Sequence, residues 1–208
     1  MFRRVFVAAS MLMLTAFAAQ ADKFVAGTHY EVVAEKATAK AEVKEFFSFY
    51  CGHCFRFEPY ANKLASQLPQ GVELEKVHVD FVQAATPEVQ NALARAYLVG
   101  KSAGQGEKVA AMIFDYIHQK RATFSNEDDI RKLLLANDFD AKINSMPTVA
   151  GANAMKAAQN KWSENRVLSG VPMLLINGKY KPKFEALKSE NFEQELNELV
   201  NYLLAKKD

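Results

Sequence analysis

The sequence predicts an α/β protein whose frame of strands and helices is interrupted by an all-helical segment. Residues 43–81 contain a strand, a helix and a strand in succession, and two further strands and a helix close the chain. Between these parts, residues 86–162 carry apolar side chains at helical spacing and no strand signal. We therefore expect one domain built from residues 22–84 and 163–208 and an inserted all-helical domain over residues 85–162.

The first half of the frame should begin with a short strand at residues 30–33. Residues 43–50 are rich in aromatic and β-branched side chains, which favours a second strand running straight into the cysteines. Residues 51–68 suit a helix, and Pro59 should introduce a kink in it. Residues 72–81 alternate between apolar and polar side chains, so they predict a third strand.

The inserted segment should begin with Thr86-Pro87, because threonine is a good N-cap and proline suits the first helical position. Gly104-Gln105-Gly106 breaks this helix, and a second amphipathic helix is expected over residues 109–117. Ser125-Asn126-Glu127-Asp128 resembles a capping box that opens a third helix. Two more short helical segments are expected around Pro147.

The second half of the frame resumes with a buried strand over residues 167–176. Asn177-Gly178 is a strong signal for a two-residue hairpin turn, and residues 179–183 form the return strand. Residues 191–207 carry apolar side chains at helical spacing and predict a final amphipathic helix.

The N-terminus indicates export. Arg3-Arg4 precedes an apolar run, and Ala19-Gln20-Ala21 matches a small-residue cleavage site, so residues 1–21 are predicted to be a cleaved signal peptide. The apolar run is shorter than the ~20 residues needed to cross a bilayer. No later stretch is long enough to span a membrane, and we expect a soluble protein of the bacterial periplasm.

The charge balance excludes some classes of partner. The chain has 26 basic and 24 acidic side chains, so it lacks the basic excess that holds a nucleic-acid backbone. Loss of residues 1–21 removes two arginines and no acid, which leaves the mature chain formally neutral. Nucleic-acid binding is not expected. A monomer is expected, because no separate dimerisation segment follows the signal peptide.

The two cysteines, Cys51 and Cys54, lie in a Cys-Gly-His-Cys motif. A bridge between them closes a very short loop and gains little stability, so redox chemistry explains the pair better than structure does. At the start of a helix, the unpaired backbone N–H groups and the helix dipole should stabilise the Cys51 thiolate. Such a thiolate attacks disulfides and leaves readily. Cys54, one turn further along, could resolve a mixed disulfide.

The motif has other interpretations. A structural zinc site needs four ligands, and the remaining histidines, His29, His78 and His118, are scattered. An inert structural bridge is disfavoured by the short loop. His53 could add a donor or a positive charge beside Cys51, or it could be a tolerated spacer. No metal or cofactor is expected beyond the redox-active disulfide.

Three further residues are ambiguous from sequence. Pro172 near a strand start could be a feature of an edge strand. Glu45 and Lys76, on neighbouring predicted strands, could form a buried pair that directs proton movement to Cys54, or both could be strand-end residues in water.

In these residues the chain resembles the DsbA family of periplasmic thioredoxin-like oxidoreductases. The similarity covers nearly the whole mature chain, including the inserted helical segment. Its motifs, in order, are residues 45–50 entering 51–54, residues 76–81, Gly170-Val171-Pro172, and residues 177–180. The resemblance implies a thioredoxin fold with an inserted all-helical domain.

The resemblance also implies roles for individual residues. Cys51 would be the attacked and attacking sulfur, Cys54 its buried partner, and Val171-Pro172 would form a cis peptide bond facing them. Glu45 and Lys76 fall on the positions of a buried acidic and basic pair of the family.

One departure from the family concerns the residues between the cysteines. The best-known members carry Pro-His, whereas this chain carries Gly52-His53, the pair typical of protein disulfide isomerases. Because this dipeptide lies at the helix N-terminus, it should tune the stability of the thiolate and hence the oxidising strength of the site.

By the same resemblance, we expect a disulfide donor for unfolded exported proteins with free cysteines. An inner-membrane, quinone-linked protein of the DsbB type would reoxidise it. Backbone pairing near Val171-Pro172 and apolar contacts from Met173, Tyr50 and Phe55 would bind many sequences loosely. Alternatives are an isomerase or reductase with the same motif, and a peptide-binding chaperone whose thiols matter little.

Overall fold

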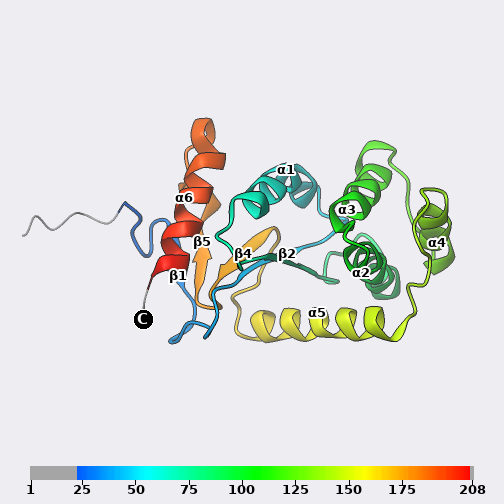
Figure 1. The fold of residues 1–208 in the computed structure, drawn as a ribbon, viewed down its shortest axis with the longest axis horizontal. Coiled ribbons are helices and arrows are strands. Elements are labelled where there is room, and N and C mark those ends of the chain that lie inside the picture. The colour runs from blue at the N-terminus through cyan, green and yellow to red at the C-terminus, as the bar shows by residue number, and fades with distance from the viewer. Residues whose placement is uncertain (1–22, 207–208) are drawn as a thin grey trace, which may run out of the picture.

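The computed structural model describes residues 23–206 of the chain, and within them one mixed sheet carries helices on both faces (Figure 1). Its order is β1-β5-β4-β2-β3. β2 and β3 run parallel with α1 between them in sequence, and the other neighbours are antiparallel. The predicted signal peptide lies outside the described residues. The strands are β1 (Tyr30–Val32), β2 (Val43–Phe47), β3 (Leu74–His78), β4 (Met173–Ile176) and β5 (Tyr180–Pro182).

β2 ends earlier than predicted. The sequence favoured a strand up to residue 50, but the sheet ends at Phe47 and residues 48–50 turn out of it. Ser48 causes this turn, because its carbonyl accepts from Cys51 N at 3.0 Å and its Oγ accepts from Tyr50 N at 3.2 Å. The strand therefore does not reach the cysteines, and a short turn connects the end of β2 to Cys51.

β4 is also shorter than the predicted strand over residues 167–176. The backbone N–H groups of Val167 and Leu168 donate to the carbonyl of Trp162, so they close a helix instead of joining the sheet. This leaves Val171-Pro172 as a loop at the start of β4. The peptide bond between these two residues is cis, as the resemblance implies.

α1 (Gly52–Gln67) and α6 (Phe192–Ala205) pack against each other and against one part of the sheet (Figure 1). Cys51 is the N-cap of α1, since its sulfur accepts from Cys54 N at 3.3 Å. Pro59 lies inside α1 on its exposed side, where its missing N–H removes one internal hydrogen bond.

As predicted, the inserted segment contains helices and no strand between β3 and β4. Thr86 caps the first helix through its hydroxyl, which accepts from Val89 N. Asn126, rather than Ser125, caps the third, because its side chain accepts from the N–H of Asp129. The helices are α2 (Pro87–Ser102), α3 (Gly106–Phe114) with a π-helical turn (Asp115–Gln119), α4 (Glu127–Leu135) and α5 (Met146–Glu164).

The prediction of two short helices around Pro147 is wrong, because α5 is one helix of 19 residues. Pro147 lies in its first turn, where a backbone N–H would have no helical partner and proline is tolerated. In Figure 1, α2, α3 and α4 gather at one end of the molecule and α5 returns from them beneath the sheet, where it contacts β3. The exact domain boundaries at residues 84/85 and 162/163 stay a prediction.

The apolar core forms two clusters that meet at the sheet. One lies between α1, α6 and the sheet, and the other lies between the sheet and α2–α5. The predicted turn at Asn177-Gly178 is present, with φ of +51° and +59°. Among residues 23–206, every helix is too short or too polar to cross a bilayer.

Candidate active site

The two cysteines differ in exposure, and both are free thiols in this structure. Cys51 is partly exposed at the N-terminus of α1, whereas Cys54 is fully buried one turn further along. Cys51 Sγ accepts from the backbone N of Cys54 and lies 3.3 Å from the carbonyl oxygen of Val171, to which its thiol donates. A substrate sulfur can therefore reach Cys51 but not Cys54.

These contacts shift the two thiols in opposite directions. The pKa of Cys51 is lowered from 9.0 to about 6, chiefly because the Cys54 thiol donates to its sulfur. The backbone N–H groups of Cys54 and His53 add to this, while partial burial opposes it. Burial, above all, raises the pKa of Cys54. Cys51 is thus the thiol of the pair that ionises more readily, which supports its predicted role as the reactive thiolate.

Beneath Cys54, Lys76 binds two carboxylates at once. Its Nζ lies 2.8 Å from Glu45 Oε2 and 2.7 Å from Glu58 Oε2, and it also sits 4.9 Å above the ring of Phe47. The parallel register places Glu45 opposite Lys76, and Glu58 reaches them from α1. The sequence left open whether Glu45 and Lys76 pair. In the structure they do, and at 0% and 5% exposure neither lies in water.

The cluster holds one cation between two acids in a dry environment. Burial alone would lower the pKa of Lys76, but the two carboxylates outweigh it and raise that pKa. Burial raises the pKa of Glu58, although Lys76 opposes the shift. Glu45 Oε1 and Glu58 Oε1 are buried without a hydrogen-bond partner in the described structure. Glu45 also raises the pKa of Cys54, so the cluster can influence the buried thiol electrostatically.

Two histidines that the sequence left unassigned hold the backbone that leads into the motif. His78 Nε2 accepts from Phe49 N at 3.2 Å, and His118 Nε2 donates to Phe49 O at 2.8 Å. Burial lowers the pKa of His78 to about 3, so it stays a neutral acceptor. His118 comes from the π-helical turn and stacks on Phe55 at 5.0 Å. The inserted segment thus supports the active-site turn directly.

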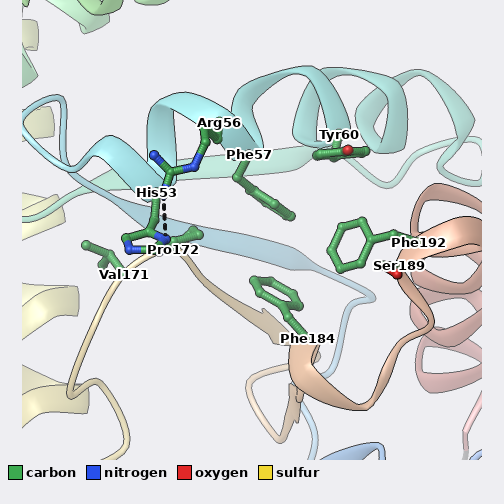
Figure 2. A pocket seen from close by; sticks show the side chains of 9 residues that line it. All are labelled: His53, Arg56, Phe57, Tyr60, Val171, Pro172, Phe184, Ser189 and Phe192. Atoms are coloured by element: carbon green, nitrogen blue, oxygen red, sulfur yellow. Dashed lines mark hydrogen bonds between the residues drawn. The ribbon is translucent and has the colours of Figure 1, made fainter. Parts of the chain in front are cut away.

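A groove of about 450 Å³ opens beside the cysteines (Figure 2). One wall comes from α1, one from the loop before β4, and one from the two short 3-10 turns that follow β5 together with the start of α6. Most of its lining is aromatic or aliphatic. The residues that line it are His53, Arg56, Phe57, Tyr60, Val171, Pro172, Phe184, Ser189 and Phe192.

The predicted substrate-binding residues divide into three groups. Val171 and Pro172 line the groove, and their substrate-binding role stays a prediction. Tyr50 and Phe55 are half-buried against the inserted segment, outside the groove, and their role stays a prediction. The prediction that Met173 contacts the substrate is wrong. Met173 lies in β4 opposite Phe46, and its side chain is only 4% exposed, so it cannot offer a surface to a substrate.

Sequence reasoning missed Glu58 and most of the groove. Glu58 follows Cys54 by four residues, so the helical period puts both on one face, a signal that was available. Phe184, Ser189 and Phe192 come from a segment at least 130 residues further along the chain, and no local pattern connects them to the motif. The structure also brings Arg56 to His53, whose Nδ1 accepts from Arg56 Nη2 at 3.0 Å.

Comparisons with known proteins agree with this geometry. A family model described as a DSBA-like thioredoxin domain matches residues 42–197. The thiol:disulfide interchange protein DsbA of Pectobacterium carotovorum is 33% identical over 94% of this chain and 95% of its own length. The protein of the same name from Yersinia pestis is 31% identical with the same coverage.

Solved structures give the same picture. The disulfide oxidoreductase DsbA of Proteus mirabilis superposes with a TM-score of 0.72 at 27% identity, covering 88% of this chain and 98% of that one. DsbA from Klebsiella pneumoniae gives a TM-score of 0.73 at 27% identity, covering 89% and 100%. A further match is the Proteus mirabilis protein with a non-covalently bound peptide, at a TM-score of 0.72 and 27% identity, covering 88% and 99%.

Proposed function

This chain belongs to the family of DSBA-like thioredoxin domains, and from that premise we propose that its oxidised form donates the Cys51–Cys54 disulfide to exported proteins. The protein is a thiol:disulfide oxidoreductase with a thioredoxin-like fold. The observation that carries the proposed direction of transfer is the lowered pKa of Cys51, at about 6, beside a buried Cys54. A stabilised thiolate favours the reduced enzyme and therefore favours giving the disulfide away.

The proposed reaction consists of two thiol–disulfide exchanges. A substrate thiolate attacks Cys51 Sγ, the Cys51–Cys54 bond breaks, and Cys54 leaves as a thiolate that takes up a proton. A second substrate thiolate then attacks the substrate sulfur of the mixed disulfide, and Cys51 leaves as its stabilised thiolate. The substrate dithiol is oxidised by two electrons and the enzyme disulfide is reduced by two, so the exchange balances.

Several residues would support these steps. Glu45, Glu58 and Lys76 would take up or supply the proton of Cys54, and the effect of Glu45 on the pKa of Cys54 supports this role. The groove would receive the extended chain of the substrate on its apolar side chains, with the Val171 backbone beside Cys51. The related Proteus mirabilis protein with a bound peptide supports a peptide as the occupant.

The cellular setting is part of the proposal. The predicted signal peptide at residues 1–21 supports a periplasmic location, where disulfides persist. Unfolded exported proteins with free cysteines would be the substrates. An inner-membrane, quinone-linked protein of the DsbB type would restore the disulfide, and no bound cofactor would be needed.

Comparing the melting temperatures of the reduced and oxidised forms tests the direction of transfer. The folded pKa of Cys51, about 6, lies below its ordinary 9.0, so the thiolate's stabilisation is full above pH 9.0 and is lost as pH falls through about 6. Discounted by about half for the exposed part of the side chain, it is on the order of 2 kcal/mol. The melting temperature of the reduced form, relative to that of the oxidised form, should therefore rise by ~4–8 °C as the pH is raised from 5 to 9.

A Cys51→Ser variant, which cannot form the disulfide, is the control, and glutathione disulfide should not change its melting temperature. We expect the reduced wild-type protein to melt above the oxidised protein at pH 9. A difference between the forms that does not vary with pH, or an oxidised form that melts higher at pH 9, would contradict a donor and favour isomerase or reductase work.

A further inference from the structure

The groove beside the cysteines contains a single permanent charge. Its lining comes entirely from the described part of the chain and is mostly aromatic or aliphatic, with Ser189 and His53 as polar members. The charged residue is Arg56, which lies at the end of the groove nearest the motif (Figure 2). An occupant of the groove would thus meet apolar walls and one guanidinium.

One hydrogen bond orients that guanidinium. Arg56 Nη2 donates to His53 Nδ1 at 3.0 Å, as the dashed line in Figure 2 marks. Because a guanidinium has donors and no acceptor, Nδ1 must be unprotonated in this arrangement. Arg56 Nη1 would lie 3.7 Å from a Cβ added at Gly52. The charge therefore lies against the two residues between the cysteines.

Arg56 has no acidic partner in residues 23–206. The nearest acid in sequence, Glu58, is turned inward and bound to Lys76, and Arg56 forms no ion pair with any other described carboxylate. One of its five N–H donors is used by His53, so the others face solvent or an incoming ligand. Arg56 is exposed, so these free donors are accessible to a carboxylate on a substrate.

We propose that Arg56 makes this enzyme prefer substrates with a carboxylate side chain within two residues of the reactive cysteine. The inference rests on the proposed function, because it assumes that the substrate occupies the groove while its sulfur meets Cys51. The carboxylate would accept hydrogen bonds from the free edge of the guanidinium. A lysine at the same place would meet a like charge and be disfavoured.

The test compares reduced two-cysteine peptides that differ only at positions −2, −1, +1 and +2 around the first cysteine, with Asp, Asn or Lys at one position at a time. The second-order rate constant for their oxidation by pre-oxidised enzyme, in a single turnover of the Cys51–Cys54 disulfide, is measured with the wild-type protein and with Arg56→Gln. Lys63→Gln, which removes an exposed cation further along α1, is the control and should behave as wild type. Comparing the Asp:Asn ratio between the two enzymes cancels any effect of the acid on the peptide's own thiol.

We expect the Asp:Asn ratio of the wild-type enzyme to exceed that of Arg56→Gln by about two- to fivefold at one position or more, the range of a partly exposed ion pair. High salt should shrink this difference. Equal ratios in the two enzymes at all four positions would overturn the inference, and so would a mutation that slows every peptide by the same factor. If the wild-type enzyme oxidised none of the peptides, the proposed function would fail and this inference with it.

Discussion

Replacing Cys51 with serine should lower the rate of substrate oxidation by at least ~10³-fold, because the attacked sulfur and the leaving thiolate are the same atom. Cys54 cannot take over, since it is fully buried and burial raises its pKa. The measurement is the oxidation of a reduced, unfolded substrate protein by stoichiometric enzyme, followed by thiol labelling.

Cys54→Ser is the matched variant, and it should fail in a different way. It retains the Cys51 thiolate, so it should form a mixed disulfide with glutathione disulfide and hold it, because no second thiol is present to resolve it. Cys51→Ser should form none. A Cys51→Ser protein that oxidised substrate at the wild-type rate would contradict the assigned roles. A wild-type protein that oxidises no substrate but binds unfolded substrate as well as both variants do would instead identify a chaperone whose thiols matter little.

Replacing Lys76 with methionine should cost about 3–5 kcal/mol of unfolding free energy near neutral pH. The change leaves Glu45 and Glu58 buried without a cation, and an uncompensated buried charge is strongly destabilising. Denaturation in urea measures the loss. Burial raises the folded pKa of Glu58, and such a carboxylate destabilises the fold above its ordinary pKa, so the loss should shrink as the pH falls toward 5.

Lys44→Met is a close control for this variant. Lys44 lies next to Glu45 on β2, and its partner Glu75 lies next to Lys76 on β3, so the same two strands carry both pairs. The Lys44 pair is solvent-accessible, and its loss should cost no more than about 1 kcal/mol. Equal losses in Lys44→Met and Lys76→Met would contradict the special position of the buried cluster.

Local chemistry made much of the fold predictable. Thr86-Pro87 marks a helix start through capping, and Asn177-Gly178 marks a hairpin through positive φ, and both are found where predicted. The failures arose from local hydrogen bonds and helix positions that hydrophobic periodicity does not register. Ser48 turns the chain out of the sheet before the motif, and α5 continues as one helix through a region expected to hold two.

Part of the site is predictable from adjacent residues, and part forms only when distant segments meet. Cys51 and Cys54 carry their chemistry in four consecutive residues, so the sequence alone predicts the thiolate and its buried partner. The groove is different, because α1 and the segment around Phe184 meet only in the folded chain. The contact of Arg56 with His53 depends on side-chain conformation within the helix, and residue spacing alone does not specify it.

The redox equilibrium of the mature protein with glutathione tests the central claim most directly. Mixtures of reduced and oxidised glutathione at pH 7 would be equilibrated with the protein, and thiol labelling would give the fraction with free Cys51 and Cys54. The stabilised Cys51 thiolate predicts a protein that stays reduced even in strongly oxidising mixtures, and hence a disulfide donor. A protein that keeps its disulfide until glutathione is almost fully reduced would contradict the account and reverse the direction of electron flow.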